Sequence, residues 1–385
     1  MREPGGAGPS PAGPGRAIVT PRRSSTGALR WGVLAPTARI ARLAVLPALI
    51  ASDSASVVAV ASASTGETPG RSECGIGPGP RWYRSYETVL DDDEVEAVYV
   101  PLPNSLHRPL VEAALAAGKH VLCEKPLATT AADAQAMAAA AQRAGRVLLE
   151  AYMTPHHPRT EAIAVAARSP ELGEPRFAHA GFTFRMDRPD DHRMDPAMGG
   201  GALLDVGIYC LAPLLAFAGT EPDRVAATAV GGPEPAGTEA NADQPTGTAG
   251  GTAADGSIGA TVDISFAGLL SFPGGPTASF ECSFDAAGRQ ILELVGSKGA
   301  LYCEQAFTPG PDDTTYLWRD AAGRVEQRRS GGGRLYQLMV EHFAEVVAGR
   351  AEPVHPLSAT LAVARTIDRL RASLVTPRPP ERTQV

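Results

Sequence analysis

The chain has 385 residues, of which 44% are hydrophobic and 20% are charged, and its 35 basic and 42 acidic residues give a formal net charge of −7. A chain of this length exceeds one ordinary hydrophobic core, so we expect two domains. The acidic balance leaves no basic footprint for nucleic acid, and no apolar run reaches the ~18 residues that a membrane span needs. We therefore expect a small-molecule partner, and neither nucleic acid nor a membrane.

The five cysteines are scattered without a CxxC or Cys/His spacing. Their placement argues against structural zinc or a disulfide framework and favours reduced thiols in a cytoplasmic protein. The four consecutive acids at 91–94 are typical of a solvated turn rather than a metal cluster, so we expect no metal. Residues 1–28 are rich in Gly, Pro, Ala and Ser and are predicted to form a disordered tail.

Between residues 29 and 153, short apolar runs alternate with helical patterns. Strands are expected at 29–34, 57–62, 95–100, just before Lys125 and at 147–153, and helices at 40–51, 86–90, from His107 onward and at 130–144. This alternation predicts a doubly wound parallel sheet of the dinucleotide-binding (Rossmann) type over 29–153. Chemistry in such sheets lies just past the carboxyl ends of the strands, which is where Lys125 falls.

The turn after the first strand is where a phosphate is expected. It keeps one glycine, Gly32, where dinucleotide folds usually have two or three. The hypothesis is a weakened pyrophosphate site in which Thr37, Ala38, Arg39 and Ile40 present backbone amides at a helix N-terminus. The alternative is an ordinary strand-turn-helix connection.

The second strand ends at Ser62 with no acidic residue after it. An acidic residue there accepts hydrogen bonds from the ribose hydroxyls of NAD and repels the extra phosphate of NADP. Its absence favours NADP, with NAD as the other possibility.

From residue 154 the pattern changes to one or two helices followed by strands with two-residue alternation. Strands are expected at 177–184, 262–266, 277–284, 290–295 and 300–304, with hairpin-like turns at 285–288 and 296–299. Residues 231–256 read as a flexible insertion, 335–347 and 357–374 as amphipathic helices, and 375–385 as a tail. The second domain, 154–374, is thus predicted to be α+β with a large, mostly antiparallel sheet.

Four stretches then point to a known family. They are VYVPLPNSLH (98–107), CEKPL (123–127), GGGALLDVGIYCL (199–211) and ELVGSKGAL (293–301). Together they resemble the group of nicotinamide oxidoreductases that includes glucose-fructose oxidoreductase, inositol dehydrogenase and MocA. The resemblance spans roughly 29–374, and it is nearest to the branch of dimeric dihydrodiol dehydrogenase and NADP-dependent D-xylose dehydrogenase.

The resemblance implies roles for three residues. Tyr209 is the expected proton-transferring group. Lys125 is expected beside the nicotinamide, where it would lower the pKa of Tyr209 and hydrogen-bond the reacting oxygen. Asp205 lies four residues before Tyr209, on the same helix face, and would orient the substrate or Lys125. Without the lysine stretch, the pattern would indicate only that Asp205 is an acidic residue at the start of a helix and that Tyr209 is a half-buried aromatic residue.

Other residues carry less specific expectations. Pro101, Asn104 and Glu124 are expected to border the cofactor, as in the family. His107 would either line the nicotinamide or simply begin its helix, and His157 would either line the substrate pocket or serve packing.

The expected function is NADP-dependent dehydrogenation of a sugar, either an aldose or a pyranose, or of a cyclic trans-diol, by hydride transfer to nicotinamide. The alternatives are a non-catalytic dinucleotide-binding regulator of the same fold and an NAD-assisted glycosidase. A broad antiparallel sheet also predicts a homodimer or homotetramer formed through that sheet.

Overall fold

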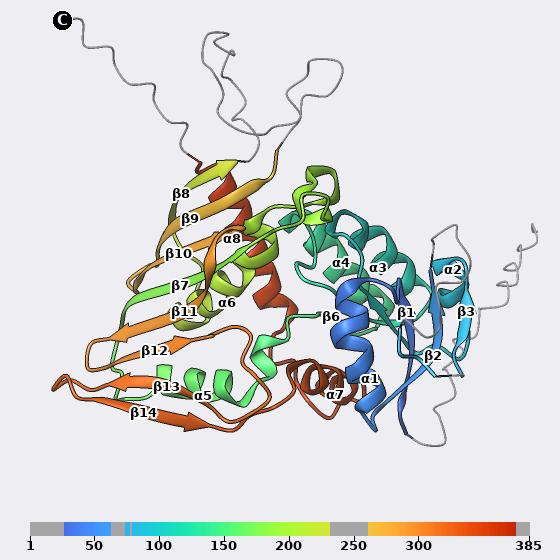
Figure 1. Cartoon of the computed structure of the whole chain (residues 1–385), viewed down its shortest axis with the longest axis horizontal. Coiled ribbons are helices and arrows are strands. Elements are labelled where there is room, and N and C mark those ends of the chain that lie inside the picture. The colour runs from blue at the N-terminus through green and yellow to red at the C-terminus, as the bar shows by residue number, and fades with distance from the viewer. Residues whose placement is uncertain (1–26, 63–73, 78, 232–260, 375–385) are drawn as a thin grey trace, which may run out of the picture.

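A computed structural model describes residues 27–62, 74–77, 79–231 and 261–374 (Figure 1). The expected insertion at 231–256 lies outside the described residues apart from residue 231, as does nearly all of the expected N-terminal tail and the whole C-terminal one. Two sheets, each with its own helices, lie side by side (Figure 1).

The first sheet has six parallel strands in the order β3-β2-β1-β4-β5-β6. The strands are β1 (Leu29–Leu34), β2 (Ala55–Ala61), β3 (Arg81–Tyr83), β4 (Ala97–Val100), β5 (His120–Cys123) and β6 (Leu148–Glu150). The predicted doubly wound parallel sheet is therefore confirmed. Strand β3 was not expected, because three half-buried residues after a stretch rich in Gly and Pro show no periodicity.

The helices of this half alternate with its strands, and two of them begin at a side-chain cap. They are a π-helix η1 (Ala41–Val45) continued by α1 (Leu46–Ala51), then α2 (Tyr86–Leu90), η2 (Asn104–Leu106), α3 (His107–Ala116) and α4 (Ala131–Ala144). Ser85 and Thr130 accept hydrogen bonds from the backbone amides at the starts of α2 and α4, and Gly145 ends α4 at a φ of 60°. These local signals are why the predicted helices have nearly the observed bounds.

The second sheet has eight strands in the order β14-β13-β12-β11-β7-β10-β9-β8, and only the β7–β10 pair is parallel. The strands are β7 (Pro175–Arg185), β8 (Arg224–Gly231), β9 (Asp263–Ser271), β10 (Thr277–Ser283), β11 (Asp285–Gly296), β12 (Ala300–Glu304), β13 (Thr314–Arg319) and β14 (Val325–Ser330). The predicted large, mostly antiparallel sheet is confirmed.

Two details of this sheet were predicted wrongly. The turn expected at 285–288 is no hairpin, because β11 pairs with β7 instead of β10, and the irregular residues form a register shift at the start of β11. Strands β8, β13 and β14 were missed, since β8 and β14 are largely exposed and none of the three shows a clean alternation of polar and apolar residues in sequence. The hairpin at 296–299 is present, closed by a hydrogen bond from Gly296 N to Gly299 O.

The remaining helices connect the two sheets. They are η3 (Thr154–His156), α5 (Pro158–Ala167), η4 (His192–Met194), η5 (Pro196–Met198), the π-helix η6 (Leu203–Gly207), α6 (Ile208–Ala218), α7 (Leu335–Val347) and α8 (Leu357–Ala372). Helices α5, α6 and α8 lie against one face of the large sheet, while α7 returns to α1 of the first half (Figure 1). There the rings of Trp31 and Phe343 lie 5.0 Å apart. The second half of the chain thereby helps to cover the first sheet.

One helical stretch, Pro196–Ala218, is long and apolar enough to cross a membrane by length and composition. This differs from the expectation that no run would be long enough. However, 72% of its most apolar window is buried inside the protein. Its apolar character is explained by its place in the core, against β7 and β10.

Gly32 lies inside β1, three residues before the turn, and is fully packed. A Cβ there would come within 2.5 Å of Val89 Cγ1 and 3.1 Å of Val95 Cγ1. The structure thus gives Gly32 a packing role, and its expected role in cofactor binding stays a prediction.

We predict that Gly32→Ala lowers the free energy of unfolding by about 1–3 kcal/mol, because the added methyl group overpacks the β1–α2 contact. Urea denaturation measures this effect. Gly310→Ala is the matched control, since no atom lies within 4 Å of its added Cβ. A variant of unchanged stability that had lost affinity for NADPH would contradict the packing role.

Candidate active site

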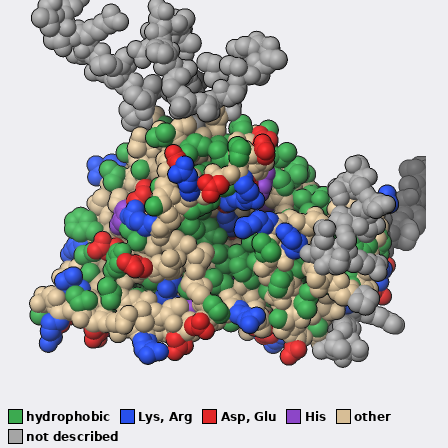
Figure 2. All heavy atoms as spheres, viewed as in Figure 1, with side chains coloured by type: hydrophobic (Ala, Val, Ile, Leu, Met, Phe, Trp, Pro, Cys, Tyr) green, Lys and Arg blue, Asp and Glu red, His purple; other side chains and the backbone are tan. Residues whose placement is uncertain are grey.

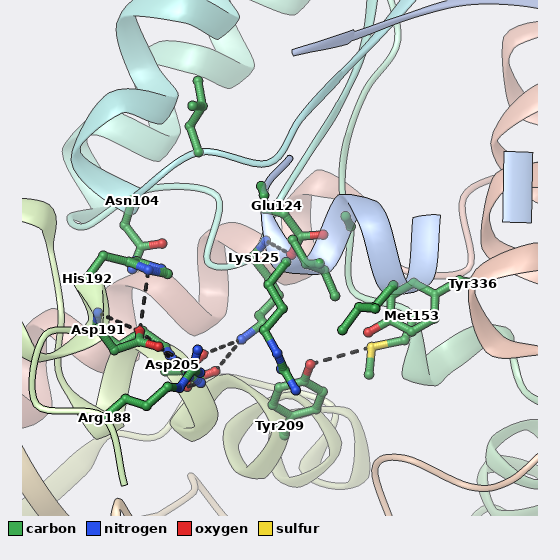
Figure 3. A pocket seen from close by; sticks show the side chains of 17 residues that line it. Asn104, Glu124, Lys125, Met153, Arg188, Asp191, His192, Asp205, Tyr209 and Tyr336 are labelled. Carbon is green, nitrogen blue, oxygen red and sulfur yellow. Dashed lines mark hydrogen bonds and ion pairs between the residues drawn. The ribbon is translucent and has the colours of Figure 1, made fainter. Parts of the chain in front are cut away.

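A cavity of about 370 Å³ lies between the two sheets, past the carboxyl ends of β1, β4, β5 and β6. Figure 2 shows Lys and Arg side chains gathered on the face between the two halves. Of the expected site residues, the cavity is lined by Ala38, Arg39, Ile40, Asn104, Glu124, Lys125, Asp205 and Tyr209. The structure therefore brings together the residues to which catalytic roles were assigned (Figure 3).

Lys125 lies in the loop after β5, before a cis peptide bond to Pro126. Its Nζ is 2.7 Å from Oδ1 of Asp205 and 2.7 Å from the backbone oxygen of the same residue. Burial alone would raise the pKa of Asp205, but the charges of Lys125 and Arg193 outweigh burial and lower it. Asp205 is thus an ionised carboxylate that fixes the lysine, which agrees with the expected orienting role.

Tyr209 lies one helical turn beyond Asp205, and its hydroxyl donates to Sδ of Met153 at 3.5 Å. Lys125 Nζ is 5.1 Å from the centre of the tyrosine ring. Burial, followed by the negative charges of Glu124, Asp205 and Glu150, raises the pKa of Tyr209 well above its usual value. This direction is opposite to the expected lowering by Lys125, and burial is its largest cause. Tyr209 therefore keeps its proton at neutral pH.

Buried side chains hold the lysine loop in place. Glu150, at the end of β6, accepts from the backbone amide of Leu127 at 2.7 Å and from Thr360 Oγ1 of α8 at 2.9 Å. His107 is fully buried, with its ring nitrogens 3.0 Å from Pro126 O and 2.8 Å from Leu102 O. Burial lowers the pKa of His107. Of the two readings of His107, the structure favours the one in which it begins its helix, since α3 starts at His107 and the cavity lining does not include it.

Glu124 extends from the same loop into the cavity. The buried hydroxyl of Tyr99 in β4 donates to Glu124 Oε1 at 2.6 Å, and the amide of Lys125 donates to Oε2 at 3.2 Å. Burial raises the pKa of Glu124 despite these donors. Because both carboxylate oxygens are held, the orientation of Glu124 is fixed.

The turn after β1 has an unusual backbone at Ala35, whose φ is +45°. Such a left-handed conformation costs a non-glycine residue about 1–2 kcal/mol, which is why dinucleotide folds prefer glycine in this turn. Ala38 N donates to Ala35 O at 2.9 Å, and the turn leads into η1. Ala38, Arg39 and Ile40 thus reach the cavity at the start of a helix, where backbone amides without intrahelical acceptors favour a phosphate.

Four other expected residues do not line this cavity. Thr37 is exposed on the turn, Pro101 is buried behind Leu102, and Ser62 lies at the end of β2 with its amide donating to Tyr83 O. His157 is buried and caps α5, its Nδ1 accepting from Arg159 N at 3.0 Å. Of the two readings of His157, the structure favours packing over substrate binding.

Sequence analysis missed several residues of the cavity wall. They are Leu43, Leu102, Ala151, Met153, Arg188, Asp191, His192, Arg193 and Tyr336. The segment between β7 and η6 contributes four of them, and it has no periodic pattern to mark it. Tyr336 lies in α7, a helix that was predicted correctly, but the hydrophobic pattern of this helix marks only its apolar face. Among the described residues, no group of three or more His, Cys, Asp or Glu is arranged to hold a metal.

Comparison with known proteins identifies the family. Residues 37–152 match the model of the oxidoreductase family with an NAD-binding Rossmann fold (GFO_IDH_MocA), and residues 161–302 match the GFO/IDH/MocA C-terminal domain. The chain belongs to the GFO/IDH/MocA oxidoreductases. The expected family, its fold and an enzymatic activity of the oxidoreductase class are confirmed, and so is a nicotinamide cofactor.

Individual members of the family are similar to this chain over most of its length. D-xylose 1-dehydrogenase (NADP(+)) 2 of Haloferax volcanii is 34% identical over 349 residues, which is 90% of this chain and 98% of the relative. A dTDP-3,4-didehydro-2,6-dideoxy-alpha-D-glucose 3-reductase of Streptomyces antibioticus is 36% identical over 73% of this chain and 77% of its own. The solved structure of a 3-ketoreductase from Actinomadura kijaniata, in complex with NADP and TDP-benzene, has a TM-score of 0.77 and 29% identity, with 90% of this chain and 98% of that one covered.

We predict that Ala35→Val lowers the free energy of unfolding by about 1–3 kcal/mol and weakens NADPH binding, because a β-branched residue tolerates positive φ poorly. Ala35→Gly is the matched control and is expected to retain stability and binding. Urea denaturation and fluorescence titration with NADPH measure the two effects. Equal behaviour of the two variants would show that the turn does not depend on this conformation.

Proposed function

We propose that the protein is an NADP-dependent oxidoreductase that interconverts a ring hydroxyl and a carbonyl group of a sugar or cyclic diol. The observation that carries this proposal is the juxtaposition of Lys125, Asp205 and Tyr209 in one cavity next to the turn after β1. The names of the relatives, which include a xylose dehydrogenase, a deoxysugar 3-reductase and trans-1,2-dihydrobenzene-1,2-diol dehydrogenases, support the substrate class.

The residues around the cavity fit a dinucleotide. Ala38, Arg39 and Ile40 would hold its phosphates at the start of η1, and Asn104 and Glu124 would border its nicotinamide end. The bound cofactor supplies the hydride acceptor for oxidation, or the hydride donor for reduction.

The chain itself supplies the proton chemistry. In the reductive direction Tyr209 donates its phenolic proton to the substrate oxygen, which gains negative charge as the adjacent carbon gains hydride. Lys125 hydrogen-bonds the same oxygen, while Asp205 keeps the ammonium group aimed. In the oxidative direction Tyr209 takes the proton back from the hydroxyl. Burial raises the pKa of Tyr209, so the phenol holds its proton at neutral pH and oxidation should need a higher pH.

The two alternative functions use the same fold. A non-catalytic regulator would have no need for a lysine held by two hydrogen bonds beside a neutral tyrosine. An NAD-assisted glycosidase would turn over substrate without net change in free cofactor, and the absorbance of NADPH at saturating substrate distinguishes it from a dehydrogenase.

The preference for NADP rests on the end of β2. Ser62 stands there in place of an acid, buried beside the end of β3. An uncharged side chain leaves room for a phosphate on the ribose, whereas a carboxylate would repel it.

The open face of the large sheet supports the proposed homodimer or homotetramer. Its register places Phe177, Leu269 and Leu317 on one face, and all three are exposed. Association would remove this apolar surface from water. We also propose a cytoplasmic location, and domains at 29–153 and 154–374.

We predict that Tyr209→Phe lowers kcat by about two to four orders of magnitude while NADPH affinity is unchanged, because only the proton donor is lost. Steady-state kinetics and fluorescence titration measure the two effects. Tyr302→Phe is the matched control, since that hydroxyl lies outside the cavity on β12 and donates to Glu304. If kcat were unchanged, Lys125 would have to transfer the proton.

We predict that Ser62→Asp lowers the ratio of NADPH to NADH affinity by about 10- to 100-fold, because the new carboxylate repels the ribose phosphate and accepts from the ribose hydroxyls of NADH. Calorimetric titration with each cofactor measures the ratio. Ser62→Asn, which is of the same size and uncharged, serves as the control. An unaltered ratio in the aspartate variant would place the ribose elsewhere.

A further inference from the structure

The segment between β7 and η6 places a second charged group beside the catalytic lysine. Asp191, whose side chain is only 6% exposed, lies 2.8 Å from Arg188, 3.4 Å from His192 and 2.9 Å from Arg193. The hydrogen bond from Arg193 is the main reason that the pKa of Asp191 is far below its usual range. Asp191 is thus a fixed negative charge in the wall of the cavity (Figure 3).

Arg193 uses its whole guanidinium group to join two carboxylates. Its Nε and Nη2 donate to the two oxygens of Asp191 at 2.9 and 3.1 Å, and its Nη1 donates to Asp205 Oδ2 at 3.0 Å. The backbone of Arg193 is also fixed, because its carbonyl accepts from Gly201 N at 2.9 Å and would lie 2.3 Å from a Cβ on Gly200. Both ends of the residue are therefore held before any ligand arrives.

Asp205 therefore forms ion pairs with two cations, each through a different carboxylate oxygen. Lys125 Nζ pairs with Oδ1, and Arg193 Nη1 pairs with Oδ2. With Oδ2 occupied, the lysine is confined to the side of the carboxylate that carries Oδ1. Because arginine stays charged at any working pH, it also weakens the hold of Asp205 on the lysine proton.

We infer that Arg193, anchored by Asp191, is a positioning residue that sets the direction of Lys125 and brings a second positive charge to the carboxylate that holds it. This inference deepens the proposed function, because it concerns the same site, but its main test needs no substrate. The charged and titratable groups that line the cavity with Lys125 are Asp205 from η6, Tyr209 from α6, Glu124 from the lysine loop, Arg188, Asp191, His192 and Arg193 from the segment after β7, Tyr336 from α7 and Arg39 from the turn after β1.

The reactivity of each lysine can be measured separately, because the chain contains only three, Lys119, Lys125 and Lys298. The rate of reductive dimethylation of each, followed by peptide mass spectrometry between pH 6 and 11, reports where each amine loses its proton. Lys298 is exposed and serves as an internal reference.

For Arg193→Gln we expect the midpoint of Lys125 reactivity to move up by about 0.5–1.5 pH units while that of Lys298 stays in place. The sign follows because loss of a neighbouring cation, and release of Asp205 to the lysine alone, both favour the ammonium form. The basic limb of the kcat/KM profile should move in the same direction. Arg185→Gln is the matched control, since Arg185 is exposed and pairs with Asp187.

Two further variants separate positioning from simple bridging. Arg193→Lys keeps the positive charge but loses the planar guanidinium group that donates to both carboxylates. The pH midpoint of Lys125 reactivity should therefore stay near that of the wild type, while kcat falls. Asp191→Asn removes a negative charge from the cavity wall and leaves Arg193 paired with Asp205 alone, so a downward shift is expected. A fall in activity with no shift of Lys125 reactivity in either Arg193→Gln or Asp191→Asn would overturn the inference. NADPH titration of each variant reports folding, and failure of the proposed function itself would appear in Tyr209→Phe instead.

Discussion

The ion pair between Lys125 and Asp205 is the interaction on which the site depends. The lysine comes from the loop after β5 in the first sheet, and the carboxylate comes from η6, which packs against the second sheet. Neither half holds the pair alone. A buried ion pair is weak evidence of stability, because the desolvation of both charges offsets most of their attraction. Its value here is geometric, since it fixes one amine at the contact between the two halves, which packing and hydrogen bonds such as that from Thr360 to Glu150 also join.

The surrounding contacts serve the same end. Glu150 holds the amide of Leu127, His107 joins the loops after β4 and β5, and Tyr99 fixes Glu124. Each partner is buried, and each acts on the backbone or on a carboxylate next to Lys125. The lysine loop is therefore specified by residues from β4, β6 and α3. A change in any of them would alter the site without touching a ligand.

The fold could be predicted because its signals are local. Apolar runs such as 95–100, and caps such as Thr130, mark the parallel sheet and its helices independently of the rest of the chain. Lys125, Asp205 and Tyr209 could be found because they stand in stretches with family-specific spacing. Arg193 and Asp191 could not, since their role exists only after the segment following β7 folds back against η6. The pKa of Tyr209 was predicted in the wrong direction because burial and three carboxylates cannot be read from one motif.

The partner of the Tyr209 hydroxyl has a consequence for how readily the proton is released to a ligand. That partner is the thioether sulfur of Met153, at 3.5 Å. A thioether is a weak acceptor, whereas a carbonyl or carboxylate in its place would compete strongly for the phenolic hydrogen. An arriving substrate oxygen therefore exchanges a poor acceptor for a good one. The phenolic hydrogen of Tyr209 is thus held by an acceptor that a substrate oxygen can replace.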